Sequence, residues 1–204
     1  MTTMTIEAVR AASRRGRRPP ILPSASKVRP VPTVVLGLDL AIQTTGWALL
    51  VGGRPDAHGV FTLPDRRRGE PLAAWLMRRA EELARQIDVL LFAHTPEIVG
   101  YEYPDSPRQS WSGGAKGREF HAVQGLSRAE GMLLALWPTC GRGLPLVAVP
   151  ASEARRLATG RPGATKEQVA YALRTYRGWD LAGWGEDEVD AASVALAARE
   201  GITG

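Results

Sequence analysis

Four acidic residues occupy positions from which folding could gather them into one site. Asp39 lies near the end of one hydrophobic run, and Glu102 lies near the end of another. Asp187 and Asp190 are three residues apart in a segment of helical pattern, so both side chains point to one face of the helix. Carboxylates without a nearby histidine or cysteine favour hard cations, above all Mg²⁺ or Mn²⁺.

Such a cluster of acids has a definite chemistry. Two divalent ions about 3.5–4 Å apart would activate a water molecule and stabilise the leaving oxygen of a phosphodiester. Without a cation, the carboxylates would repel one another and raise their own pKa values. The four acids therefore predict a divalent-cation site that hydrolyses phosphodiester bonds.

Each acid also has a simpler explanation when it is taken alone. Asp39 could be a turn or cap residue after a strand, and Asp187 could be a helix N-cap. Glu186 could complement the helix dipole. However, Glu186 is also an i, i+4 neighbour of Asp190, so spacing alone leaves open whether Glu186 or Asp187 belongs to the site. The presence of all four acids together favours the cation site.

The pattern of apolar residues predicts the elements that must position these acids. Strands are expected at 34–40, 44–51, 59–63, 97–103 and 145–149. Helices are expected at 72–91, 123–137, 150–159, 166–176 and 187–198. Gly52 and Gly53 suit a hairpin turn, and Thr165 suits a helix N-cap. This order of elements predicts a mixed α/β layered sheet.

Composition is that of an ordinary globular chain of 204 residues, with 44% hydrophobic and 23% charged side chains. No apolar run approaches the roughly 20 residues that a membrane helix needs, so no membrane span is expected. The single cysteine, Cys140, excludes an internal disulfide and a cysteine-rich zinc site. It is compatible with a reducing compartment, and we expect a cytoplasmic protein.

Positive charge is concentrated at the N-terminus. Residues 1–32 carry a single acid, Glu7, against seven basic side chains: Arg10, Arg14, Arg15, Arg17, Arg18, Lys27 and Arg29. This segment therefore contributes +6 to a chain whose net charge is +5, and residues 33–204 contribute −1. We expect 1–32 to be a disordered arm and 33–204 to be the folded domain. The arm could bind DNA phosphates, act as a solubilising tail, or target the protein to an organelle.

Four segments resemble the motifs of one known family. The segment 37–48 (GLDLAIQTTGWA) is similar to the first motif of the RuvC-type Holliday junction resolvases, in which an aspartate precedes a short turn and a threonine-glycine-aromatic strand. Glu102 matches the strand-end glutamate of the second motif. The segment 164–169 (ATKEQV) resembles the lysine-bearing helix start of the third motif, and 187–192 (DEVDAA) resembles the final Asp-x-x-Asp-Ala motif. The resemblance spans about 34–199.

This resemblance implies a ribonuclease H-like fold, with a mixed five-stranded sheet of three antiparallel and then two parallel strands, flanked by helices. It implies a nuclease that cuts four-way DNA junctions as a homodimer, with two Mg²⁺ or Mn²⁺ ions in each active site. The metal ligands would be Asp39, Glu102, Asp187 and Asp190. Lys166 would steady the scissile phosphate, and Arg155 would be a second basic residue on DNA. A lysine is unfavourable at a helix N-terminus, so a phosphate partner would explain Lys166.

The chain departs from the family in two places. Ala41 stands where the family usually has a glycine. The family's aromatic wedge after the second motif is replaced here by Tyr103 and a longer loop, in which either Tyr103 or Trp111 could stack on an unpaired base. A tryptophan packed on the domain is the alternative for Trp111. The residues of this loop that we expect to contact DNA are Arg108, Trp111, Lys116 and Arg118.

Other functions fit the sequence less well. A ribonuclease H-like nuclease for other branched DNA or RNA–DNA hybrids would use the same acids. An ATP-binding protein of the actin and Hsp70-like superfamily would need a second lobe, for which 204 residues leave no room. A non-catalytic DNA-binding protein would be expected to lack one or more of the acids. The resemblance favours a bacterial or viral origin.

Overall fold

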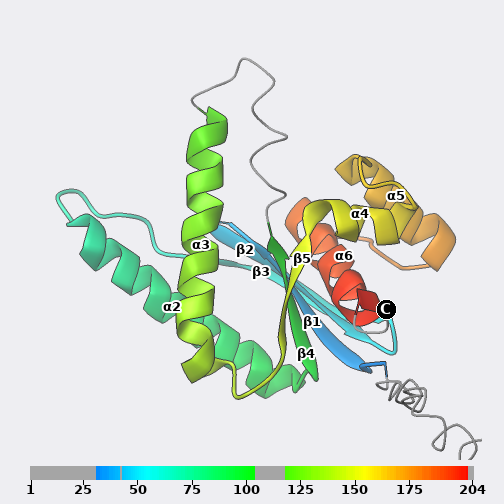
Figure 1. Ribbon diagram of the computed structural model, residues 1–204, viewed down its shortest axis with the longest axis horizontal. Helices are drawn as coiled ribbons and strands as arrows, with labels where there is room; N and C mark the ends of the chain where they lie inside the picture. The colour runs from blue at the N-terminus through cyan, green and yellow to red at the C-terminus, as the bar shows by residue number, and fades with distance from the viewer. Residues whose placement is uncertain (1–30, 42, 104–117, 202–204) are drawn as a thin grey trace, which may run out of the picture.

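A computed structural model describes residues 31–41, 43–103 and 118–201, with the backbone alone for 118–126. Its centre is one five-stranded sheet in the order β3-β2-β1-β4-β5 (Figure 1). Strands β1, β2 and β3 are antiparallel, whereas β4 and β5 run parallel to β1, as predicted. The strands are β1 (Val34–Leu40), β2 (Thr44–Val51), β3 (Arg54–Thr62), β4 (Ile98–Tyr103) and β5 (Leu146–Pro150).

Helices cover both faces of the sheet. Two helices, α2 and α3, pack on one face, and α4, α5 and α6 lie on the other (Figure 1). None of the described helices is both long and apolar enough for a bilayer span. The helices are α2 (Leu72–His94), α3 (Arg118–Cys140), α4 (Ala151–Thr159), α5 (Lys166–Arg177) and α6 (Glu186–Gly201).

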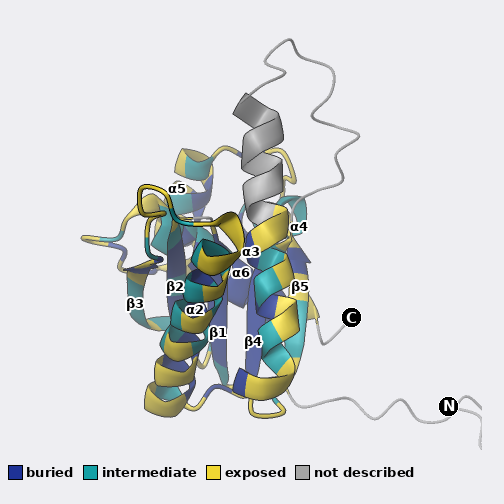
Figure 2. Ribbon diagram, turned by 90° about the vertical axis from the view of Figure 1, so that its left-hand side faces the viewer, coloured by how far each residue is buried: buried dark blue, intermediate teal, exposed yellow. Residues whose placement is uncertain are grey.

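Burial on both faces explains why β1 is a continuous hydrophobic run. Alternate side chains point to opposite faces of a strand, so Leu36 and Leu38 enter the core beneath α2 and α3, while Val35 enters the core beneath α6. Figure 2 shows β1, β2 and β4 as largely buried strands between exposed helix surfaces. The residues at the ends of β1 and β4 therefore lie at the rim of an otherwise filled interior.

Three glycines let α6 lie directly on the sheet. A Cβ atom at Gly37 of β1 would lie 2.1 Å from the carbonyl oxygen of Ala191, and a Cβ at Gly46 of β2 would lie 2.3 Å from that of Asp187. At Gly100 of β4, a Cβ would lie 2.7 Å from the Cβ of a small α6 residue, Ala198. All three distances are too short for a real side chain, so these glycines are required by the close approach of the helix backbone.

The path of α6 follows from this arrangement. Its first turn lies over Gly46 of β2, its middle over Gly37 of β1 and its last turns over Gly100 of β4. Gly46 pairs with Asp39 in the β1–β2 ladder. The start of α6 is thereby fixed above the end of β1 that bears Asp39.

A capping box fixes the start of α5. The Thr165 side chain accepts a hydrogen bond from the Gln168 backbone, and the Gln168 side chain accepts one from the Thr165 backbone. The predicted N-cap at Thr165 is therefore confirmed. Lys166 becomes the first residue of the helix, in the position that the motif required.

The bounds of two elements differ from the sequence prediction by more than three residues, and the others agree to within three. The expected strand 59–63 is only the second half of β3, because pairing with β2 already begins at the Gly52–Gly53 turn, at Val51 and Arg54. The first half of β3 is polar and contains Pro55, which an edge strand tolerates. The helix expected at 123–137 is α3, which extends two residues past Pro138.

The glycine contacts predict that Gly37→Ala destabilises the fold. The added methyl group would overlap the α6 backbone, and overpacking of this kind costs typically ~1–3 kcal/mol in the free energy of unfolding. Urea unfolding followed by circular dichroism measures the loss. Gly163→Ala is the matched control, because a Cβ at Gly163 meets no atom within 4 Å. Equal stability of the two variants would contradict the assigned role of Gly37.

Candidate active site

Asp39 and Glu102 are neighbours on adjacent parallel strands. Leu38 of β1 pairs with Tyr101 of β4, so the next residue on each strand faces the α6 side of the sheet at the same edge. Adjacent strands are about 4.8 Å apart, which brings the two carboxylates close together. The strand pairing thus explains why two acids distant in sequence meet at one edge.

Helix α6 adds Asp187 and Asp190 from above this edge. Asp187 lies over Gly46, and its Oδ2 accepts a hydrogen bond of 3.4 Å from the Thr44 hydroxyl of β2. The Asp190 side chain is only 14% exposed. Both acids therefore project from the first two turns of α6 toward the ends of β1 and β2.

Lys166 supplies a positive charge to this group of acids. Its Nζ lies 2.6 Å from Oδ2 of Asp190 and 3.9 Å from Oε2 of Glu186. Burial acts to lower the pKa of Lys166, but the bond to Asp190 and the surrounding negative charge outweigh it, so the pKa is raised. The lysine is held as a cation beside the acids.

The pKa of Asp39 shows the effect of the neighbouring negative charges. Burial is the main cause that raises the pKa of Asp39 to about 8, and the charges of Glu102, Asp190 and Asp187 raise it further. Lys166 acts in the opposite direction. The four acids and the lysine are therefore near enough to influence one another, and one ammonium group does not balance four carboxylates.

The donor chemistry fits a hard divalent cation, since carboxylate oxygens are its preferred protein ligands. In the described part of the chain, however, no three histidine, cysteine, aspartate or glutamate side chains are close enough together to hold one metal ion. Like charges repel, and Lys166 holds Asp190 to itself. Charges influence one another over distances longer than the roughly 2.0–2.6 Å of a metal–oxygen bond. The acids can therefore raise the pKa of Asp39 without lying close enough together to hold one ion.

The geometry distinguishes Asp187 from Glu186. The Glu186 side chain is 77% exposed and faces Lys166, whereas Asp187 contacts Thr44 and contributes to the raised pKa of Asp39. Asp187 is therefore the residue that the fold places with Asp39.

A second set of contacts holds the start of α6 in place. Nδ1 of His58 on β3 lies 2.8 Å from Oε1 of Glu188, and the His58 ring stacks on Trp184 with 3.9 Å between centroids. The other Glu188 oxygen accepts a hydrogen bond from the Gly185 backbone. His58 and Trp184 lie outside the four motifs, and the pairing of β3 with β2 brings His58 to the start of α6.

The structure describes only some of the remaining residues that are predicted to contact DNA. Arg155 is half-buried on α4, and Tyr103 is exposed at the end of β4. Arg118 begins α3, but its side chain is not described. Arg108, Trp111 and Lys116 lie outside the described residues.

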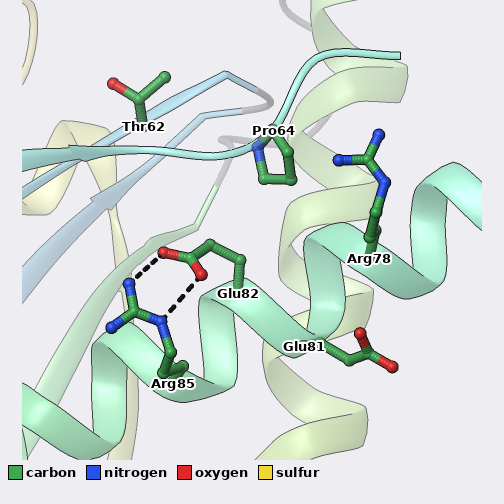
Figure 3. Close-up of a pocket in the computed structure, with 6 residues that line it drawn as sticks. All are labelled: Thr62, Pro64, Arg78, Glu81, Glu82 and Arg85. Atoms are coloured by element: carbon green, nitrogen blue, oxygen red, sulfur yellow. Dashed lines mark hydrogen bonds and ion pairs between the residues drawn. The ribbon is translucent and has the colours of Figure 1, made fainter. Parts of the chain in front are cut away.

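Hollows on the described surface include one beside α2 and one between α5 and α6. The larger, about 470 Å³, lies between α2 and the segment after β3, and its charged lining includes the Arg85–Glu82 ion pair (Figure 3). It contains none of the predicted site residues. The smaller, about 150 Å³, lies between α5 and α6 and is lined by Lys166 and Asp190. The smaller hollow therefore adjoins the group of acids through Lys166 and Asp190, whereas Asp39, Glu102 and Asp187 are not among its lining residues.

Sequence comparison finds similar proteins in bacteria. Two curated proteins named crossover junction endodeoxyribonuclease RuvC, from the Hildenborough and DP4 strains of Nitratidesulfovibrio vulgaris, are each 27% identical to this chain over 168 residues. The match covers 79% of this chain and 87% of each relative. A scan against family models finds no match.

Structure comparison finds the same fold. Thermus thermophilus RuvC in complex with a Holliday junction substrate matches with a TM-score of 0.61 and 22% identity, over 83% of this chain and 97% of the other. The yeast mitochondrial Holliday junction resolvase Ydc2 matches with a TM-score of 0.55 and 16% identity, over 87% and 81%. The predicted mixed five-stranded architecture is confirmed, and the chain is similar to RuvC proteins in sequence and in fold.

The raised pKa of Asp39 predicts how stability depends on pH in metal-free protein. The unfolded chain ionises Asp39 near pH 3.8, but the folded chain keeps the proton until about pH 8. Folding stability should therefore fall as pH rises from about 4 to 8 and level off above, and Asp39→Asn should remove this loss. Thermal unfolding in a chelator, at several pH values, measures the difference between the two proteins.

A gain of ~1 kcal/mol in the free energy of unfolding corresponds to an increase of roughly 2–4 °C in Tm for a domain of this size. The advantage of Asp39→Asn should widen toward pH 8. A constant difference across the whole range would show that Asp39 titrates normally.

Proposed function

We propose that this chain, a RuvC-type protein in sequence and fold, is a structure-selective endonuclease that hydrolyses DNA phosphodiester bonds at four-way junctions. The observation that supports this most directly is the meeting of Asp39, Glu102, Asp187, Asp190 and Lys166 at one edge of the sheet. These are the residues that the motifs assign to catalysis, and they come from β1, β4, α6 and α5.

The acids would hold divalent cations, Mg²⁺ or Mn²⁺, with two in each site. Such ions supply an activated water and stabilise the leaving oxygen. The protein's part is to fix its carboxylates in position and to exclude other geometries. Thr44 orients Asp187 through its hydroxyl group, and the His58–Glu188 contact anchors the helix that bears Asp187 and Asp190.

Lys166 has a separate role in this proposal. In the free protein its ammonium group compensates part of the negative charge of Asp190. It stands at the wall of the hollow between α5 and α6, within reach of a phosphate that approaches the acids. We infer that Lys166 binds the scissile phosphate and stabilises the charge that develops on it.

Cutting a junction productively requires two nicks, so the active form is proposed to be a homodimer with one site in each subunit. The basic arm, 1–32, would add affinity for DNA without sequence preference. A cytoplasmic location stays a prediction from the sequence. The DNA contacts of the loop after β4, at Arg108, Trp111 and Lys116, stay predictions too.

The substrate class can be tested directly. Labelled four-way junction, flap, RNA–DNA hybrid and linear duplex are incubated with the protein, with Mg²⁺ or with a chelator. Symmetric nicks in the junction alone, and only with the metal, are expected. Preferential cutting of the hybrid or flap would instead support a ribonuclease H-like nuclease for other substrates.

Loss of a single acid should abolish cutting but not binding. Asp39→Asn and Asp190→Asn each remove a negative oxygen while preserving side-chain shape. We expect the single-turnover cleavage rate to fall about a hundredfold or more, the order seen when a group that stabilises transition-state charge is lost. Gel-shift titration in Ca²⁺ should give an unchanged Kd for the junction. Normal cleavage by either variant would remove that residue from the mechanism.

Asp187 and Glu186 should differ in the same assay. Asp187→Asn should slow cleavage strongly, because Asp187 is coupled to Asp39 and is held by Thr44. Glu186→Gln should leave the rate essentially unchanged, because its side chain is solvent-exposed. The reverse order of the two rates would make Glu186 the functional acid.

A further inference from the structure

The loop between β3 and α2 concentrates positive charge in the folded domain. It contains three consecutive arginines, Arg66, Arg67 and Arg68, which no motif of the family explains. The segment 65–79 holds five arginines and two acids, a net charge of +3. This contrasts with the folded domain, 33–204, whose net charge is −1.

The loop leaves the sheet at the edge that bears the acids. Thr62, the last residue of β3, pairs with Thr44 of β2, and the Leu63 backbone donates a hydrogen bond to the Gln43 carbonyl. Thr44 in turn contacts Asp187. Figure 1 shows this segment extending sideways from the end of the sheet at which α6 begins. The loop that bears the arginines therefore leaves the sheet at the same edge as the acids, two strands away from Asp39.

The loop has a defined structure organised around Glu70. Both carboxylate oxygens of Glu70 accept hydrogen bonds of 2.9 Å from the Arg78 guanidinium. Oε2 of Glu70 also accepts a hydrogen bond of 2.9 Å from the Arg67 backbone N–H. These bonds, with Arg78 the largest cause, lower the pKa of Glu70 to about 2. The Arg66 side chain donates to the Glu70 carbonyl, and Trp75 donates to the Pro64 carbonyl. The backbone of the loop is thus fastened to α2.

These contacts leave two guanidinium groups for a ligand. Arg67 and Arg68 are exposed, and within the described chain neither side chain takes part in an ion pair. Beneath the loop, Arg79 is 1% exposed and lies over the Trp75 ring, 4.7 Å from its centroid. Its Nε and Nη2 are buried without a hydrogen-bond partner among the described residues. Its charge adds to the positive field of the loop.

We propose that the β3–α2 loop is a second DNA contact, in which Arg67 and Arg68 bind phosphate oxygens of the junction arm that leaves the active site across β2 and β3. This inference rests on the proposed function. A guanidinium group matches the geometry of phosphate oxygens through paired N–H donors. Glu70 positions the two arginines by holding the loop backbone, and Arg66 supports it.

The test is the double variant Arg67→Ala/Arg68→Ala in the full chain. Junction affinity is measured by fluorescence anisotropy in Ca²⁺ over a range of salt concentrations. Loss of two phosphate contacts should weaken binding and reduce the slope of log K against log salt by ~0.9 for each contact. Arg54→Ala/Arg142→Ala is the matched control, because it removes the same charge at the opposite end of the sheet. It should keep the wild-type slope.

A second variant separates the effect of the positive charge on DNA binding from the effect of the guanidinium group. Arg67→Lys/Arg68→Lys keeps both charges and should retain the salt slope while losing part of the affinity. The loop is not a DNA contact if the alanine variant has the wild-type Kd and salt slope. The same conclusion follows if the control variant loses as much junction affinity as the alanine variant. In either case the wild-type protein would still cut junctions. If the wild-type protein neither binds nor cuts them, the proposed function fails instead.

Discussion

The direct contact of the α6 backbone with three glycines is the constraint on which the site depends. A helix normally packs on a sheet through the side chains of both elements. Here Gly46, Gly37 and Gly100 remove the side chains beneath it, and the helix descends until its backbone meets the strands. Only at this depth do Asp187 and Asp190 come level with the strand-end acids. The small residues of α6, buried from Ala191 to Ala198, serve the same close approach.

The fold gathers negative charge at an energetic cost. Burial and neighbouring carboxylates raise the pKa of Asp39 to about 8, which means that the free protein favours a neutral acid there. Lys166 offsets part of the repulsion through Asp190. Burial of apolar side chains on both faces of the sheet stabilises the fold against the remaining repulsion between the carboxylates. In the proposed function, bound cations would relieve this repulsion between carboxylates.

Much of this architecture could be predicted from the sequence. The buried strands are continuous apolar runs, and the strand-end acids and the Thr165 cap follow simple rules. The start of β3 escaped prediction because Arg54 to His58 is polar on an edge strand. The three glycines have no local signature, since each is explained by a helix distant in sequence. Thr44 and His58 became visible as partners of α6 only through the strand pairing.

The placement of α6 also has a consequence for biosynthesis. Half of the acids reside on the last helix of the described chain, and it docks on strands made at the beginning. While the nascent polypeptide emerges from the ribosome, the groove over β1, β2 and β4 stays uncovered until residues 186–201 have been translated. The group of acids is therefore incomplete until α6 has been made, and a polypeptide that ends before residue 186 would lack both Asp187 and Asp190.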